Sequence, residues 1–209
     1  MEKNLLNYET LLKITERIAQ SREFEEVTLL AVTGIRDALE CKGCALFLIN
    51  PKSQELEVAA STGLSEEYLN KGPISAIRSI ADSLKDGPVG IYDVMDDPRI
   101  QYPQEAQREG IASILAVPII TRGNPIGAVR IYTADKWEFT IEDVNLVQAV
   151  AQIAGMAIEM SRLYKGLKSS IEILKARQDQ RAQGEKRWTP HEGVPVSQGK
   201  VSSVTSGSS

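Results

Sequence analysis

The sequence predicts an α+β fold in which helices pack on an antiparallel sheet, and three features support this. Apolar segments of strand length are joined by turn-forming links, amphipathic helical patterns lie at both ends of the chain, and the composition is that of a globular protein. Hydrophobic residues make up 42% of the 209 residues and charged residues 25%, which suits one domain with a core of useful depth.

Two helices are predicted before the first strand. Apolar residues recur at helical spacing over 4–20 and again over 24–39. In the first segment Leu5, Leu12 and Ala19 are seven residues apart, which is a coiled-coil spacing. We therefore expect an N-terminal amphipathic helix over 1–22 and a domain that begins at residue 23.

Further elements follow from short apolar segments and their flanking turn residues. Strands are expected at 45–49 and 56–61, joined by the turn-forming segment 50–54. The other elements expected in this part of the chain are a short helix near 68–70, a helix over 74–84 and a short strand over 89–92.

The most informative segment runs from Ser113 to Asp143. Alternating apolar residues over 115–120, a Gly-Asn-Pro turn and a second alternating run over 126–133 predict a β-hairpin. Pro118 indicates an edge or bulged position, because proline cannot donate a ladder hydrogen bond, and Gly127 indicates a bulge or a close backbone approach.

A helix is predicted to start directly after the hairpin. Thr140 and Asp143 have the spacing of a capping box, and Phe139 precedes the cap as a hydrophobic staple does. The apolar stripe is wide up to Ile158 and narrows beyond Leu163 to a seam at coiled-coil spacing. We expect 165–182 to be a helical extension that forms a dimer seam or frays as a lone helix end, and 183–209 to be a disordered polar tail.

These segments together resemble the GAF family of small-molecule sensor domains. The resemblance rests on the Val-Pro, turn, Ile-Gly and Phe-Thr pattern of 117–140, on 56–64 with its Gly-Leu exit, and on the loop 93–102 followed by 109–111. It covers residues 7–164 and implies a GAF-like domain over 23–164. It also implies a central sheet with the terminal helices on one face and a ligand cavity under a loop and short helix on the other.

The sequence lacks the residues that several kinds of catalytic or cofactor site need. The one histidine, His191, lies in the polar tail, and neither phosphate-loop glycine pattern occurs. Haem-binding and bilin-binding GAF domains need a histidine or a cavity cysteine, so we expect no cofactor and no metal. The net charge of −4 gives no basic footprint for nucleic acid or an anionic membrane, and without a long apolar segment we expect a cytoplasmic protein.

Cys41 and Cys44 are spaced as Cys-x-x-Cys before the first strand. We expect packed thiols in a reducing compartment. The open alternatives are a thiol redox couple and half of a metal site completed in a dimer.

Five residues are candidates for ligand binding: Arg130, Tyr132, Asp93, Arg99 and Tyr102. If Val129 and Ile131 face the helices, then Arg130 and Tyr132 face the cavity. Guanidinium groups bind carboxylates bidentately, so an anionic small molecule is the expected ligand. The alternative is structural pairing of Arg130 with Glu57 and of Arg99 with Asp96.

The resulting hypothesis is a non-enzymatic sensory domain that binds a small molecule, dimerises through its terminal helices and acts on a separate effector protein. One alternative is a structural interaction module whose cavity is filled by Ile74, Ile77 and Ile111. The other is a redox protein that uses Cys41 and Cys44.

Overall fold

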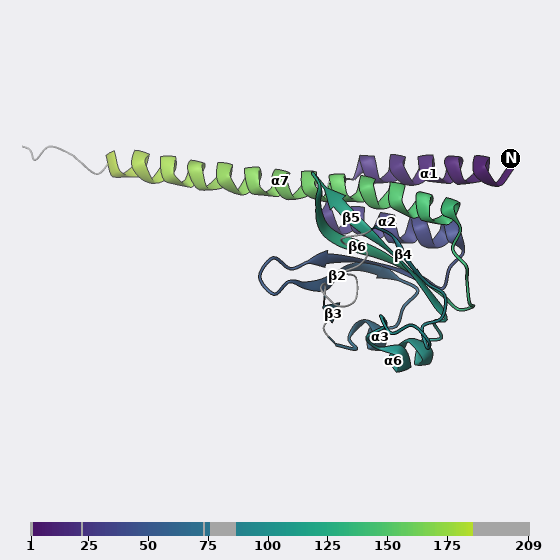
Figure 1. Cartoon of the computed structure of the whole chain (residues 1–209). Helices are drawn as coiled ribbons and strands as arrows, with labels where there is room; N and C mark the ends of the chain where they lie inside the picture. The colour runs from purple at the N-terminus through teal and green to yellow at the C-terminus, as the bar shows by residue number, and fades with distance from the viewer. Residues whose placement is uncertain (1, 22, 73, 76–86, 186–209) are drawn as a thin grey trace, which may run out of the picture. The chain divides into compact units, whose positions relative to one another are not determined.

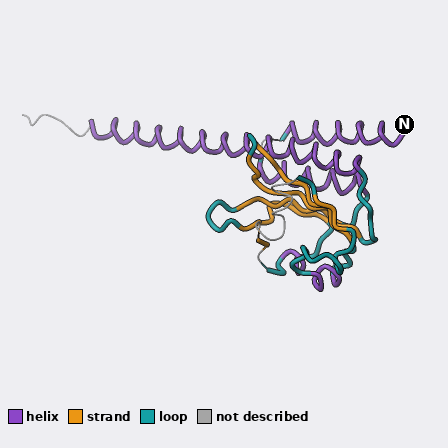
Figure 2. The backbone as a smooth tube through the Cα atoms, in the orientation of Figure 1, coloured by secondary structure: helices purple, strands orange, loops and turns teal. Residues whose placement is uncertain are grey.

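The structure, a computed structural model, describes residues 2–21, 23–72, 74–75 and 87–185 of the chain. These residues form an α+β fold with a six-stranded sheet in the order β3-β2-β1-β6-β5-β4, and every strand pair is antiparallel (Figures 1 and 2). The elements in chain order are α1 (Glu2–Gln20), α2 (Phe24–Leu39), β1 (Gly43–Ile49), β2 (Glu55–Thr62), α3 (Glu66–Leu69), β3 (Ile74–Ser75), β4 (Val89–Ile91), α6 (Pro103–Arg108), β5 (Ser113–Thr121), β6 (Asn124–Thr133) and α7 (Ile141–Glu185).

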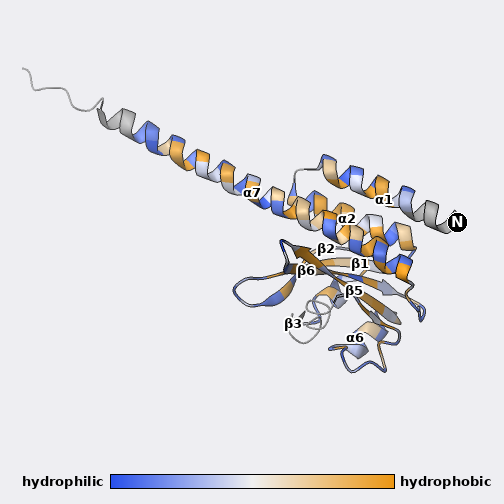
Figure 3. Ribbon diagram, turned by 45° about the horizontal axis from the view of Figure 1, so that its top comes forward, coloured by the Kyte–Doolittle hydropathy of each residue, from blue (hydrophilic) through white to orange (hydrophobic). Residues whose placement is uncertain are grey.

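The helices are divided between the two faces of the sheet as predicted. α1, α2 and the first part of α7 lie on one side, and α3 and α6 lie on the other (Figure 1). On the first side Val129 and Ile131 are fully buried in a core that includes residues of all three helices. On the second side a smaller apolar cluster forms around Phe47 and Tyr132, so β6 contributes alternate residues to two separate cores. In Figure 3 apolar residues are concentrated on the strands between these two layers.

The predicted hairpin is β5 and β6, and both of its unusual residues are explained by their positions. Among the described residues β4 pairs with β5 over Ile114–Ala116, and the pairing given at Pro118 is with Ala128 of β6. At Gly127 an added Cβ would lie 2.0 Å from the carbonyl oxygen of Phe47. A residue with a side chain therefore cannot occupy this position without moving β1 away from β6.

The predicted capping box is present at the start of α7. The Thr140 backbone N–H donates to Asp143 Oδ2 at 3.0 Å, and the Asp143 N–H donates to Thr140 Oγ1 at 3.2 Å. α7 continues to Glu185, past the boundary at 183 where a disordered tail was predicted, and 186–209 lie outside the described residues. The chain divides into two compact units, Met1–Lys165 and Gly166–Ser209, and the first of them includes α1.

The helix predicted over 74–84 does not begin at Ile74. Ile74 and Ser75 form β3, which pairs with Leu56 and Glu55 at the edge of β2. The unpaired backbone groups of an edge strand outweigh the local helical pattern here. Residues 76–84 of that prediction lie outside the described residues. Over the described part of the chain, no helix has the length and apolar character needed to span a bilayer.

Candidate functional site

The face of the sheet opposite α2 and α7 carries a buried arginine near its centre. Arg130 on β6 is 7% exposed, and its register neighbours on the adjoining strands are Ala45 and Ala116. Two small neighbours leave room for the arginine side chain along the sheet. The guanidinium carbon lies 5.3 Å from the ring centroid of Phe47, in the geometry of a cation–π contact.

A second cation approaches the same region from the segment after α3. Lys71 Nζ lies 3.5 Å from the ring centroid of Tyr68 and donates to the Tyr68 carbonyl oxygen at 2.9 Å. Burial and then the charge of Arg130 lower the pKa of Lys71 to about 8, while Glu109 and Glu105 oppose the shift.

Two tyrosines pack against each other on this side of the sheet. The rings of Tyr68 and Tyr132 meet edge to face, with centroids 5.7 Å apart, and both residues are buried. Burial raises the pKa of both phenols, and the charge of Arg130 opposes the shift in each case. Both tyrosines therefore remain neutral hydroxyl groups at physiological pH.

The position of α3 is fixed by a link to the end of α6. Ser65 caps α3 by accepting the Tyr68 backbone N–H at 3.1 Å. Its own N–H donates to Glu109 Oε1 at 3.0 Å, its hydroxyl donates to the other oxygen, and Lys42 Nζ lies 3.8 Å from Oε1. Burial opposes ionisation of Glu109, but the hydrogen bonds from Ser65 keep its pKa below the ordinary value.

Tyr102 lies against the turn that carries Lys71. Gly72 adopts φ +138°, and an added Cβ there would lie 2.6 Å from the Tyr102 hydroxyl oxygen. Of the five candidates, Arg130 and Tyr132 thus lie on this side of the sheet, and Tyr102 lies against the segment after α3.

Asp93 and Arg99 lie elsewhere, at the β4 edge. Asp93 forms an ion pair with Lys136 at 2.5 Å, and Arg99 Nε donates to Asp97 Oδ1 at 2.9 Å. These contacts lower the pKa of both aspartates. Arg99 Nη2 also lies 3.5 Å from the carbonyl oxygen of Gly90 on β4. β4 is two strands away from β6, a separation of about 10 Å at the usual strand spacing. Arg99 thus forms an ion pair with Asp97, where the structural alternative named Asp96.

The alternative pairing of Arg130 with Glu57 is wrong. β1 lies between β2 and β6, so Glu57 is not on a neighbouring strand, and its carboxylate accepts a hydrogen bond from Asn50 Nδ2 at 2.7 Å. The sheet order is a long-range property that the local pattern of either strand does not contain.

An apolar cluster lies on the same face of the sheet as Arg130. Ile111 is buried among them, as the filled-cavity alternative requires. Ile77 lies outside the described residues. The buried members of this cluster are Ala45, Phe47, Leu56, Tyr68, Ile91, Val94, Ala106, Ile111, Ile114, Ala128 and Tyr132.

The two cysteines are free thiols buried on the helix side of the sheet. Burial raises the pKa of Cys41 to about 11 and that of Cys44 well above its usual value. The Cys41 thiol also donates to the carbonyl oxygen of Gly43 at 3.4 Å. A thiolate is scarce under these conditions, so the geometry favours packed thiols over a redox couple. Within the described part of the chain, no cluster of three or more potential metal ligands is found.

Lys71 and Tyr68 were not among the sequence-based candidates. The only local signals were the short helix predicted near Tyr68 and the Gly72-Pro73 pair after Lys71. Neither signal shows that Tyr68 packs against Tyr132 of β6.

Comparison with known proteins agrees with this architecture. The family model described as GAF domain matches residues 23–158. The GAF domain of a phosphoenolpyruvate-protein phosphotransferase from Coxiella burnetii matches with a TM-score of 0.71 and 20% identity, covering 78% of this chain and 98% of that one. A free methionine-R-sulfoxide reductase from Neisseria meningitidis, solved in complex with its substrate, matches with a TM-score of 0.66 and 21% identity over 78% of this chain and 95% of that one.

A curated relative matches by sequence alone. The Methyl sulfide methyltransferase-associated sensor of Methanosarcina acetivorans is 26% identical over an alignment of 167 residues, and the match covers 76% of this chain. The chain spans 16% of the length of that relative.

Proposed function

Because this chain belongs to the GAF domain family, we propose that it is a non-enzymatic sensory or regulatory domain. It binds a small anionic molecule on the Arg130 side of its sheet and self-associates through α1 and α7. The sensor description of the Methanosarcina relative supports a sensory role. The Neisseria reductase supports small-molecule binding, since its structure contains a substrate in the same fold.

The observation that carries the ligand proposal is Arg130, a buried cation on the face of the sheet that also holds the apolar cluster around Phe47 and Tyr132. A guanidinium stays charged at any physiological pH, so the region has a permanent positive charge. The charge of Arg130 acts on Lys71 strongly enough to help lower its pKa to about 8. An anion bound to Arg130 would offset this charge, and burial would strengthen the electrostatic attraction between the two groups.

Native mass spectrometry tests the ligand proposal. The chain is purified gently, and its mass is measured before and after denaturation. A retained acidic compound is expected in the wild-type chain and is expected to be lost in Arg130→Met. Arg122→Met is the matched control, because Arg122 is an exposed arginine that pairs with Glu159 at 3.2 Å. Retention of the same compound by Arg130→Met would refute the ligand proposal.

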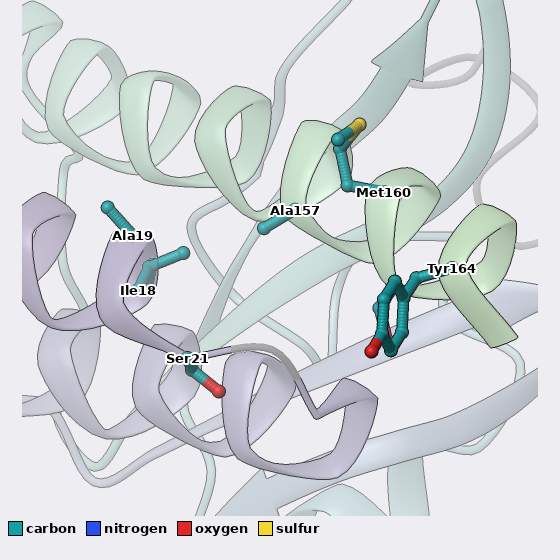
Figure 4. A pocket seen from close by; sticks show the side chains of 7 residues that line it. Ile18, Ala19, Ser21, Ala157, Met160 and Tyr164 are labelled. Atoms are coloured by element: carbon teal, nitrogen blue, oxygen red, sulfur yellow. The ribbon is translucent and has the colours of Figure 1, made fainter. Parts of the chain in front are cut away.

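The self-association proposal rests on an apolar groove between α1 and α7 within the first unit. The groove has a volume of about 390 Å³. Ile18 and Ala19 of α1 and Met160 and Tyr164 of α7 line it (Figure 4). Met160 is 68% exposed and Tyr164 is 60% exposed. An apolar patch of this kind on a soluble domain indicates an interaction surface.

The spacing along α7 indicates that a second copy covers this surface. The exposed Met160 and Leu163 are three residues apart, and within the second unit Leu167, Ile171 and Leu174 continue with steps of four and three. Apolar and polar residues alternate along α7 in Figure 3. Such steps form the seam of a left-handed coiled coil, for which a second α7 is the matching partner.

Light scattering after size exclusion tests the self-association. We expect a dimer for the wild-type chain and a monomer for Leu163→Glu. Leu29→Glu on α2 is the matched control, since Leu29 is 50% exposed and Leu163 is 51% exposed. A dimer that persists in Leu163→Glu, or a wild-type monomer, would refute this part of the proposal.

A further inference from the structure

The outer side of α1 carries apolar residues in addition to those that face the core. Ile14 and Ile18 are buried, and an added Cβ at Gly34 of α2 would lie 2.8 Å from the Ile14 side chain. On the other side of the helix, Tyr8 is 65% exposed and Leu12 is 48% exposed. A helix that is apolar on more than one side is normally covered on each of them, so the outer side of α1 indicates a contact.

The outer side of α1 and the part of α7 in the second unit have the same spacing of residues. The α1 stripe consists of Tyr8, Leu12, Thr15 and Ala19, and the α7 stripe consists of Leu167, Ile171 and Leu174. In each stripe, successive residues are alternately four and three apart. Ile171 is 50% exposed and Leu174 is 58% exposed. Both stripes therefore have the spacing of a coiled-coil seam and can pack against each other.

The charges beside the two stripes have opposite signs. Glu9 and Glu16 each directly follow a residue of the α1 stripe, and Lys168 and Lys175 each directly follow a residue of the α7 stripe. All four side chains are exposed, and in the part of the chain that the structure describes none of them forms an ion pair. The two acids have the same separation along α1 as the two lysines have along α7. The stripes are thus complementary in charge as well as in spacing.

The hand of the α-helix decides the direction in which these charges can meet. Because the helix is right-handed, the residue after a stripe residue always lies on the same side of the stripe. When two facing helices run in opposite directions, these following residues lie on one side of the contact, and when the helices run in the same direction they lie on opposite sides. Only an antiparallel arrangement therefore brings Glu16 beside Lys168 and Glu9 beside Lys175.

The same charges oppose the pairing of like stripes. Two α1 stripes in antiparallel order would place Glu9 of one copy beside Glu16 of the other. Two α7 stripes in that order would place Lys168 beside Lys175. Such like-charge contacts select against wrong partners, so the charges favour α1 with α7 over either stripe with itself.

We propose that, when two copies of the chain associate, the α7 stripe of each copy packs antiparallel on the α1 stripe of the other. The proposal rests on the proposed self-association and names the segment of the second copy that covers α1. Two-fold symmetry repeats the contact, so each Glu–Lys pair forms twice. Ala19 of the α1 stripe also lines the apolar groove, so the new contact is continuous with the proposed interface (Figure 4).

The direction of α1 within the first unit agrees with this arrangement. α1 and the first part of α7 run in the same direction (Figure 1), and the end of α1 lies beside Met160 at the groove. A second α7 that passes this point in the opposite direction continues along α1 toward its N-terminus. The residues of that second helix beyond Met160 then meet the α1 stripe in antiparallel order.

Disulfide formation between introduced cysteines tests the pairing and its direction on the full chain. Glu16→Cys/Lys168→Cys places two thiols beside each other across the antiparallel contact. Glu16→Cys/Lys175→Cys is the matched control, because its thiols are then about two helical turns apart. After mild oxidation, we expect about tenfold more covalent dimer from the first variant on a non-reducing denaturing gel. The buried Cys41 and Cys44 of the wild-type chain give the background. Equal yields from the two variants would overturn the proposal.

Charge reversal tests the same contact without new cysteines. Glu9→Lys/Glu16→Lys should raise the Kd of self-association about tenfold or more in sedimentation equilibrium, because each new lysine meets a lysine. Adding Lys168→Glu/Lys175→Glu to the same chain should return the Kd to within about threefold of the wild-type value. Lys165→Glu is the matched control, since Lys165 is exposed on the side of α7 away from the stripe and should leave the Kd unchanged. A combined exchange that fails to restore association would contradict the pairing.

These results are distinguishable from a failure of the proposed self-association. A wild-type monomer in light scattering would refute the self-association and this contact together. A wild-type dimer that gives equal cross-linking in the two cysteine variants would refute only the antiparallel contact between α1 and α7.

Discussion

Glu109 should stabilise the fold chiefly by holding the first turn of α3 against the end of α6. Its carboxylate, in a side chain that is 11% exposed, accepts two hydrogen bonds from Ser65, and Ser65 in turn caps α3. Hydrogen bonds to a charged group contribute about 1.5–3 kcal/mol each, and the two share one partner, so Glu109→Ala should lower the free energy of unfolding by about 2–4 kcal/mol. Glu109→Gln can still accept one of the bonds and should lower it by about 1–2 kcal/mol.

Urea denaturation of the two variants and of the matched control Glu105→Gln measures these losses. A loss below about 0.5 kcal/mol for Glu109→Ala would refute the reasoning, since it would lie within the range of an ordinary surface substitution.

The same carboxylate gives a prediction for pH. The pKa of Glu109 is lower in the folded state than its ordinary value of 4.5. Its contribution is therefore fully present above pH 4.5 and is lost as the pH falls through the lower, folded-state pKa. The stability difference between the wild-type chain and Glu109→Gln should shrink over that acidic range, and a constant difference would contradict the assignment.

Three further outcomes are expected. Gly127→Ala should lower the free energy of unfolding by more than about 3 kcal/mol, because its Cβ would lie 2.0 Å from the Phe47 carbonyl oxygen; a loss below about 1 kcal/mol in urea denaturation would contradict this close approach. Cys41 and Cys44 should react with a thiol reagent in the native state at least tenfold more slowly than in urea, and equal rates would show that they are accessible. Thr140→Ala should cost about 1 kcal/mol through loss of one half of the capping box, and an unchanged thermal midpoint would refute that role.

Local patterns predicted the local structure well. The capping box of Thr140 and Asp143 depends only on residues three apart, and it forms as expected. Side chains alternate between the two faces of a strand, so Arg130 points away from the helices once its neighbours Val129 and Ile131 are taken as residues of the helix-side core. These features need no knowledge of which strands lie side by side.

The composition of the site could not be predicted in this way. β1 lies between β2 and β6, so Glu57 is separated from Arg130 by a whole strand. Lys71 reaches the site because Ser65 and Glu109, residues 44 apart in the chain, join α3 to α6. Contacts between distant segments decide both outcomes, and a sequence pattern within either segment does not contain them.

The alternation of side chains along β6 also connects the proposed ligand binding with the proposed self-association. Arg130 faces the candidate ligand site, while Val129 and Ile131 on either side of it are buried in the core that α7 helps to form. A close-packed core transmits displacements of its side chains, because it contains few voids that could absorb them. A ligand that moves Arg130 would therefore act on the packing of α7 through a single strand. If α7 provides the contact between two copies of the chain, no additional element is needed to couple the ligand to self-association.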